Sequence, residues 1–261
     1  MGTVSKKSYT KPISMLKSVS RLAALLMILC LPLNMVAKKT GHAGTSIGSP
    51  LPLSNAALLN RTASISEQIY NNLGLANIGL PRIAFSMAIK GFSKLREKGL
   101  VSADSIITII DFSKSSTQKR LYVIDLKNQG IIYNTVVAHG RNSGNEYAKS
   151  FSNNPSSHKS SLGFYITEGT YNGGNGYSMK LQGAETGIND KALARAIVMH
   201  GADYANEEVI GKKGFLGRSY GCPAVPQKLN KKIIDTIKEG NCLFIYYPDQ
   251  NYLKKSKLLN G

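Results

Sequence analysis

The spacing of apolar residues changes near residue 105. Before that point, apolar side chains recur every three or four positions, which is typical of amphipathic helices. Ser64 begins a capping box for one helix, Pro81 begins a second helix, and Gly99 ends it. We expect these helices, residues 61–104, to pack as a prefix against the domain that follows them.

Beyond residue 105, short runs rich in β-branched and aromatic residues alternate with polar or glycine-bearing connectors. We predict strands at residues 106–110, 121–126, 131–138, 164–167, 177–181, 196–199 and 242–247. Residues 227–239 have the pattern of an amphipathic helix that ends at Gly240. The glycine-rich segment 171–177 is interpreted as a flexible loop and a candidate lid. The pattern therefore predicts a mainly β domain, residues 105–250, with one late helix.

Both ends of the chain differ in composition from the middle. Residues 1–37 hold five basic residues, no acidic residue and a short apolar core at residues 22–31, which is typical of a secretory signal peptide. That core is shorter than the roughly 20 residues of an ordinary membrane-spanning helix, although an uncleaved anchor is the alternative. Residues 38–60 are polar and predicted to be a linker, and residues 251–261 are predicted to be a basic tail.

The basic composition narrows the choice of partners. The 261-residue chain has a formal net charge of +18, with 42 % hydrophobic and 18 % charged residues, so it is globular rather than disordered. A basic exported protein can contact anionic wall polymers or lipid surfaces, although most lysines are interpreted as an ordinary solvated surface. The sequence has no zinc-finger spacing and no aromatic RNA-binding signature, so nucleic acid is not an expected partner. The oligomeric state is left open.

One histidine and one cysteine carry the candidate chemistry. His200 follows an apolar run, and Cys222 lies on a turn between Gly221 and Pro223. A thiol on a tight loop, with a base delivered by a neighbouring element, is a common setting for a cysteine nucleophile. The alternative is structural, with the thiol as a small buried side chain and the imidazole at the edge of the core.

The number and spacing of the cysteines argue against a disulfide scaffold and against a zinc site. Cleavage of the signal peptide removes Cys30 and leaves Cys222 and Cys242, which are too few for a disulfide scaffold. No pair has the short spacing of zinc ligands, so we predict no metal site. Cys222 is expected to be the more reactive thiol, because positive charge on His200 and Arg218 would lower its pKa, whereas Cys242 opens an apolar strand.

The segment around the two candidate residues resembles a known family. His200-Gly201 followed by Ser219-x-Gly221-Cys222 is similar to the active-site pattern of the YkuD-like L,D-transpeptidases, and residues 217–224 resemble their murein L,D-transpeptidase branch. The similarity to that branch also includes residues 109–113, 119–126, 137–144 and 161–165, and it extends roughly over residues 105–248.

The resemblance has one departure. The broad family usually has histidine between the serine and the glycine, and a polar or basic residue soon after the cysteine. This chain has Tyr220 and Pro223-Ala224 at those places. Any role of the family residues there cannot be carried over.

The resemblance implies both a fold and an activity. The fold would be the L,D-transpeptidase β-sandwich, with the catalytic loop on its rim. The activity would be that of an exported cysteine acyltransferase that cleaves peptidoglycan stem peptides through a thioester on Cys222, resolved by an amine or by water, without a cofactor. Two alternatives stay open: a non-catalytic wall-binding module that retains the fold, and a cysteine protease or amidase of another fold.

The resemblance also implies roles for individual residues. Cys222 would be the nucleophile and His200 its base, and the backbone carbonyl of Ser219 would orient the imidazole. Consecutive amides on a turn can converge, so those of Tyr220 and Gly221, with that of Cys222, are candidate donors to the oxyanion.

Three further residues are candidate substrate contacts: Arg218, His139 and Gly201. Arg218 would bind a substrate carboxylate with both arms of its guanidinium, or else pair with Asp203 or a loop carbonyl. His139 ends a predicted strand, so it would either line the cleft or be an ordinary strand-end histidine.

Overall fold

The computed structural model describes residues 55–102 and 105–261, with side chains from residue 64 onward. The expected signal peptide, residues 1–37, and residues 38–54 of the expected linker lie outside the described residues. Within the part that is described, no helix has both the length and the apolar character needed to cross a membrane.

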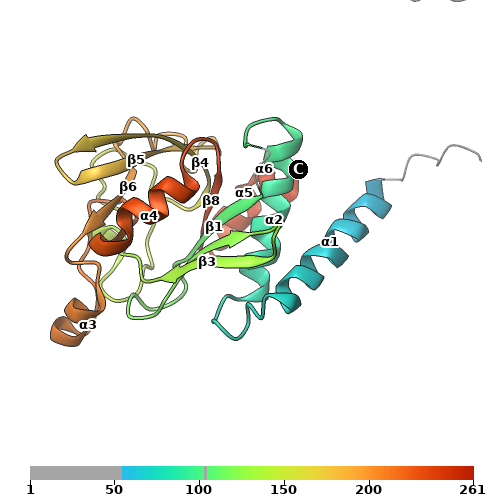
Figure 1. Cartoon of the computed structure of the whole chain (residues 1–261). Coiled ribbons are helices and arrows are strands. Elements are labelled where there is room, and N and C mark those ends of the chain that lie inside the picture. Colours follow the sequence, from blue (N-terminus) through green and yellow to red (C-terminus); the bar gives the residue numbers. More distant parts are fainter. Residues whose placement is uncertain (1–54, 103–104) are drawn as a thin grey trace, which may run out of the picture. The chain divides into compact units, whose positions relative to one another are not determined.

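The described strands form one sheet in which the order along the sheet differs from the order along the chain. The strands are β1 Ile106–Asp111, β2 Leu121–Asp125, β3 Gly130–Thr135, β4 Gly163–Gly173, β5 Gly176–Gly183, β6 Val198–Ala202, β7 Ala224–Pro226 and β8 Cys242–Tyr246. Their order in the sheet is β3-β2-β1-β8-β4-β5-β6-β7 (Figure 1). The mainly β architecture predicted from the sequence is confirmed.

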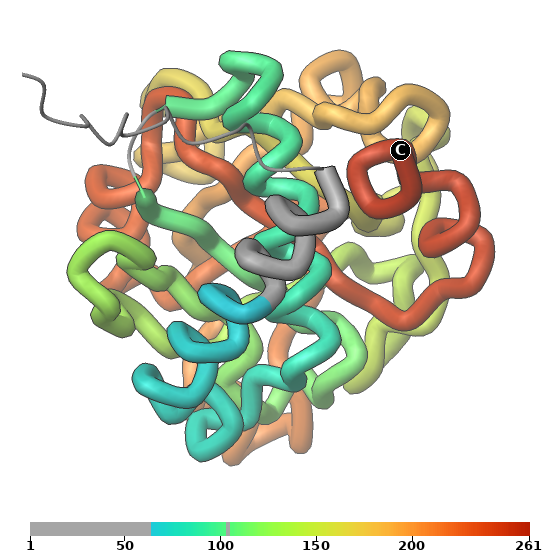
Figure 2. The backbone as a smooth tube through the Cα atoms, turned by 90° about the vertical axis from the view of Figure 1, so that its right-hand side faces the viewer, coloured from blue at the N-terminus to red at the C-terminus, as the bar shows by residue number. Residues whose placement is uncertain are grey.

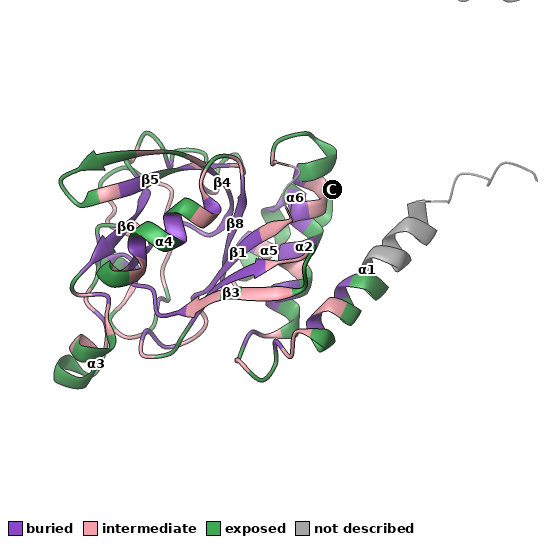
Figure 3. Cartoon of the chain, viewed as in Figure 1, coloured by how far each residue is buried: buried purple, intermediate pink, exposed green. Residues whose placement is uncertain are grey.

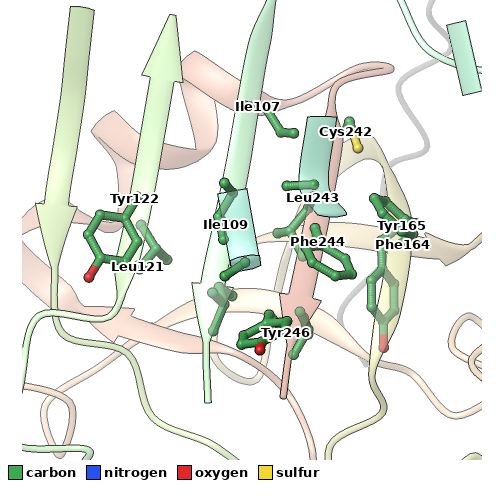
Figure 4. Packing of buried hydrophobic residues seen from close by; sticks show 14 of the residues in the cluster. Ile107, Ile109, Leu121, Tyr122, Phe164, Tyr165, Cys242, Leu243, Phe244 and Tyr246 are labelled. Carbon is green, nitrogen blue, oxygen red and sulfur yellow. The ribbon is translucent and has the colours of Figure 1, made fainter. Parts of the chain in front are cut away.

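Strand β8 lies at the centre of the sheet and joins its two halves. It pairs in parallel with β1 and antiparallel with β4, so that Phe244 stands opposite Ile109 on one side and Phe164 on the other. The rings of Phe164 and Phe244 stack with their centres 4.2 Å apart (Figure 4). All five residues of β8 are buried, which fits an apolar segment covered on both faces of a sheet.

Two of the described helices pack their apolar sides against the sheet. Helix α1 spans Asn55–Asn72, α2 Arg82–Glu97, α3 Glu207–Lys213, α4 Gln227–Ile237, α5 Gln250–Lys255 and α6 Lys257–Asn260. Helix α2 contacts β1 and β8, whereas α4 contacts β5, β6 and β7. Each buries one side and exposes the other (Figure 3). The predicted helices before the sheet and the late helix are therefore confirmed, and Pro81 is the N-cap of α2. The predicted start of the first helix is wrong, because α1 begins at Asn55, within the expected linker, and Ser64 lies inside the helix.

The end of the chain differs from the basic tail that was expected. Residues 250–260 form α5 and α6, which begin at the capping side chains Asp249 and Ser256. Tyr252, Leu258 and Leu259 are buried, and α6 lies against α2 (Figure 2). Apolar residues interspersed among the lysines thus pack onto the domain, while the lysines face solvent.

The glycine-rich segment 171–177, expected to be a flexible loop, is the tip of a β-hairpin. Gly173 pairs with Gly176 across a two-residue connection, and the ladder continues through Tyr171 opposite Ser178. Gly176 has a φ of +72°, which glycine adopts without strain. The hairpin places Tyr171 of β4 and Lys180 of β5 together, with the ammonium 5.9 Å from the ring centre.

Candidate active site

Strand pairing brings the histidine and cysteine segments together. Strand β7, which begins two residues after Cys222, pairs in parallel with β6 so that Ala224 stands opposite His200. The amide of His200 also lies 3.4 Å from the carbonyl oxygen of Pro223. The β7 strand was not predicted, and it is the element that aligns the two segments.

The thiol of Cys222 lies against the backbone that leads into β6. Its Sγ accepts a hydrogen bond from the amide of Val198 at 3.4 Å and lies 3.7 Å from the carbonyl oxygen of Ala196. Val198 and His200 are two positions apart on β6, so their side chains point to the same face of the sheet. The thiol is therefore held beside the strand that carries the candidate base.

The pKa of Cys222 differs from the sequence-based expectation. Burial raises the pKa of this thiol, and the Val198 amide and the Arg195 guanidinium offset only part of that rise. The expected lowering by Arg218 is wrong, because Arg218 hydrogen-bonds to the carbonyl oxygen of Gly144 at 3.2 Å and to the side chain of Asn145. The thiol is half-buried and protonated at neutral pH in the free protein.

The imidazole of His200 is held in one tautomer. Its Nδ1 lies 2.9 Å from the carbonyl oxygen of Gly201, which can only accept, so Nδ1 carries the proton and Nε2 carries a free lone pair. His200 is buried, and burial lowers its pKa below the ordinary value of 6.5, so the ring is neutral at pH 7. A neutral imidazole with a free Nε2 has the form required of a general base.

Gly201 contributes to this arrangement through its close packing against α4. A Cβ there would lie 2.3 Å from Oε1 of Gln227 and 2.8 Å from Cβ of Asn230. The backbone of β6 therefore packs directly against α4, and this close approach fixes the carbonyl that meets Nδ1 of His200.

Ser219 organises the cysteine turn. Its carbonyl oxygen accepts the amide of Arg141 at 2.7 Å, so it is not the carbonyl that meets His200. Its Oγ accepts the amide of Gly221 at 3.0 Å and donates to the carbonyl oxygen of Cys222 at 2.6 Å. The residue following the histidine takes the orienting role that we had expected from Ser219.

The backbone amides of the turn are not equivalent as oxyanion donors. That of Gly221 is already bound to Oγ of Ser219. The amides of Tyr220 and Cys222 have no partner among the residues that the structure describes. They are the amides of this turn that remain available to a developing oxyanion.

His139 is a buried structural residue. It is 0 % exposed, so the expectation that it lines the cleft is wrong. Its Nδ1 accepts from Nη2 of Arg120 at 2.8 Å, and its Nε2 donates to the carbonyl oxygen of Gly144 at 3.3 Å. Burial, followed by the charge of Arg120, lowers its pKa to about 3, and its carbonyl oxygen accepts the amide of Ser219.

Tyr220 forms the exposed edge of the turn. Its side chain is 65 % exposed, and its ring lies 4.5 Å from that of His158 and 5.6 Å from the guanidinium of Arg141. His158 is half-buried against this ring. The ring contacts hold Tyr220 outward and leave the side chain of Cys222 against β6.

A cavity of about 380 Å³ lies beside the segment that enters β6, and neither Cys222 nor His200 is among its lining residues. Its lining includes Glu168, Tyr171, Lys180, Leu193 and residues 196–198, the segment whose backbone contacts Sγ of Cys222. This cavity could not be predicted from local sequence patterns, because β4, β5 and the loop before β6 meet there only in the folded chain. In residues 55–102 and 105–261, no three His, Cys, Asp or Glu side chains gather as a metal site would require.

Comparisons with known proteins identify the family of the chain. A family model for the L,D-transpeptidase catalytic domain matches residues 77–246. No curated protein matches the chain.

Solved L,D-transpeptidase structures are similar to the chain over part of their length. One from Mycobacterium smegmatis has 10 % identity over 55 % of this chain and 59 % of its own, with a TM-score of 0.35. L,D-transpeptidase 1 of Mycobacterium tuberculosis has 11 % identity over 55 % and 62 %, with a TM-score of 0.32. One from Stackebrandtia nassauensis has 13 % identity over 64 % and 68 %, with a TM-score of 0.33. The chain thus covers less than two thirds of the mycobacterial proteins.

Proposed function

Because the chain belongs to the L,D-transpeptidase catalytic domain family, we propose that it is an exported, cysteine-dependent enzyme that acts on peptidoglycan stem peptides. One observation carries the proposal. The thiol of Cys222 is held by the Val198 amide, on the strand where His200 keeps its Nε2 free. A module that only binds the wall has no need of this arrangement.

The proposed reaction begins with proton transfer from Sγ of Cys222 to Nε2 of His200. The thiolate attacks the carbonyl carbon between the third residue of a tetrapeptide stem and its terminal D-alanine. The amides of Tyr220 and Cys222 stabilise the resulting oxyanion. His200 then returns the proton to the departing amine, so that D-alanine leaves and a thioester remains on Cys222.

A second nucleophile completes the cycle. An amine of a neighbouring stem gives a cross-link, and water gives a shortened stem, with His200 again taking the proton and returning it to the thiolate. The cavity beside residues 196–198 is the proposed place for the acyl donor, because the backbone of two of its lining residues, Ala196 and Val198, contacts the thiol. Its lining offers both signs of charge, on Glu168 and Lys180, to a stem that carries carboxylates and an amine.

Incubation with purified disaccharide-tetrapeptide, followed by mass spectrometry of the products, tests the proposal. We expect D-alanine release by the native protein and none by Cys222→Ala. His200→Gln should lose about 10²–10⁴-fold in rate, because a general base contributes that much. Cys242→Ala is the matched control, since that thiol is fully buried, and it should keep its activity. Release of D-alanine by Cys222→Ala would refute the mechanism, and stem binding without turnover by the native protein would favour the wall-binding alternative.

Export is part of the proposal and rests on the sequence of residues 1–37, with its basic start and short apolar core. We expect the mature protein in the cell envelope to begin just after Ala37. N-terminal sequencing of envelope material checks this. A full-length protein recovered from the cytosol would contradict both the location and the proposed substrate.

A further inference from the structure

Arg195 lies beside the cysteine turn, on the segment that leads into β6. Its Nη1 donates to the carbonyl oxygen of Ser152 at 2.8 Å and to Oγ of Ser161 at 2.6 Å. Its Nη2 donates to Oγ of Ser157 at 3.2 Å and to the carbonyl oxygen of Lys159 at 2.7 Å. The guanidinium therefore ties residues 152–161 to the base of the site.

The charge of Arg195 is not compensated by an anion. All four acceptors are neutral, and no carboxylate pairs with it anywhere in the described chain. Its Nε is buried and, in the described residues, has no partner. Arg195 is half-buried, so its charge is partly withdrawn from water. Proteins usually pair such a cation, because an unpaired one destabilises the fold. We therefore expect the unpaired guanidinium of Arg195 to have a functional role.

The nearest group that can become an anion during the proposed reaction is Cys222. A Cβ placed on Gly221 would lie 3.5 Å from Nη2 of Arg195 and 2.8 Å from the carbonyl oxygen of Lys159, which accepts from the same Nη2. The residue after Arg195 is Ala196, whose carbonyl oxygen contacts Sγ of Cys222. Arg195 thus borders the thiol through the turn on one side and through the strand entrance on the other.

The other ionisable neighbours do not account for the unpaired charge. The phenol of Tyr165 interacts with Arg195, but it is fully buried and burial raises its pKa far above the physiological range, so it stays neutral. Tyr204 interacts with the thiol, and burial raises its pKa to about 12. His200 is neutral until it receives the thiol proton. Arg195 is the permanent cation in this group.

We propose that Arg195 is a positioning residue that braces the cysteine turn and supplies the positive charge that stabilises the Cys222 thiolate. The inference rests on the proposed role of Cys222 as nucleophile. When the thiol proton moves to Nε2 of His200, the sulfur becomes negatively charged. The thiolate then provides the anionic partner that Arg195 lacks in the free protein. The hydrogen bonds to Ser161, Ser157 and two carbonyls hold the guanidinium in place before that charge develops.

The test is the pH dependence of alkylation of the folded protein by iodoacetamide, followed by intact mass and peptide mapping. This readout needs no turnover, so it distinguishes failure of this inference from failure of the proposed activity. Cys242 is 0 % exposed, so the folded protein should report Cys222 alone. For Arg195→Gln we expect the alkylation midpoint to rise by about one pH unit, with about tenfold slower labelling at neutral pH.

Conservative and distant variants separate charge from packing. Arg195→Lys keeps the charge without the fork, so its midpoint should stay near that of the native protein while its Tm falls. Arg96→Gln, on the exposed side of α2, removes an arginine elsewhere and should change neither quantity by much. An unchanged midpoint in folded Arg195→Gln would overturn the proposal, even if kcat fell.

If Arg195→Gln does not fold, a neighbouring pair of variants decides. Ser157→Asp places a carboxylate next to Nη2 of Arg195, whereas Ser157→Asn places a neutral group of the same shape there. The aspartate should neutralise the guanidinium and raise the alkylation midpoint above that of the asparagine variant. Equal midpoints in the two variants would overturn the role assigned to Arg195.

Discussion

Cys222 and His200 are each held in their uncharged form before substrate arrives. Burial raises the pKa of the thiol above 9.0 and lowers that of the imidazole below 6.5. Both changes disfavour a standing pair of thiolate and imidazolium. Charge separation therefore belongs to the proposed reaction itself, when the substrate carbonyl is present and Arg195 and the free amides of the turn face the developing anions.

The neutral thiol and the neutral imidazole predict that kcat/KM is constant over a broad range of pH. We expect kcat/KM to rise with pH and level off below pH 6.5, because protonated His200 cannot accept the thiol proton. It should stay level up to about pH 9, because the thiol loses its own proton only above that pH. The difference in thiolate ultraviolet absorbance between the native protein and Cys222→Ala should be absent at pH 7. A clear absorbance difference there, or a loss of activity between pH 7 and 8.5, would contradict a neutral pair.

At the scale of elements, one glycine sets how closely the helical prefix approaches the sheet. Gly91 lies on the buried side of α2, where a Cβ would come within 2.0 Å of Cζ of Phe164 on β4. Phe164 cannot move freely, because its ring stacks on Phe244 of the central strand (Figure 4). Because Gly91 has no side chain, α2 can pack directly against the middle of the sheet.

We expect Gly91→Ala to destabilise the protein although alanine is the better helix former by about 1 kcal/mol. Overpacking a filled core typically costs about 1–3 kcal/mol, which outweighs that gain. Gly211→Ala in α3 is the matched control, since a Cβ there meets nothing within 4 Å, and it should be neutral or slightly stabilising. Thermal unfolding followed by circular dichroism measures both. A Gly91→Ala variant as stable as the native chain would show that Phe164 yields easily.

The long strands and helices could be predicted, whereas short elements could not. Runs such as residues 242–246 are apolar and aromatic enough to indicate a strand without any knowledge of neighbours. Strand β7 has three residues and forms because β6 offers it a partner. Helices α5 and α6 have six and four residues, and their lysines conceal the few apolar side chains that anchor them.

The candidate site shows the same division. The resemblance indicated Cys222 and His200, but assigned the orienting carbonyl to Ser219 instead of Gly201. The contacts of Arg195 link residues 152–161 with the cysteine turn, and no local pattern encodes such a meeting of distant segments. Sequence motifs identify reacting groups, whereas the surroundings that set their pKa values arise from tertiary packing.

At the scale of the whole molecule, α5 and α6 connect the end of the chain to its interior. Tyr252 and Ser256 both donate to the buried carboxylate of Glu185, which also accepts the amide of Phe164 at 2.8 Å. The same carboxylate thus holds the start of β4 and the final helices. Regions that the sequence pattern assigned to a catalytic domain and to a tail share one buried hydrogen-bonding group.

The central place of β8 has a consequence for how a new chain acquires its structure. Strands β1–β3 form one part of the sheet and strands β4–β7 the other. The two parts are joined only by β8, residues 242–246, which pairs with β1 and with β4. A chain that emerges N-terminus first, from a ribosome or a translocation pore, would hold two incomplete sheets with open edges at β1 and β4. Pairing between such distant segments is slow, because the loops must close before the contacts form. Folding would then be completed only after nearly the whole chain has emerged, and the waiting edges would depend on chaperones to prevent aggregation.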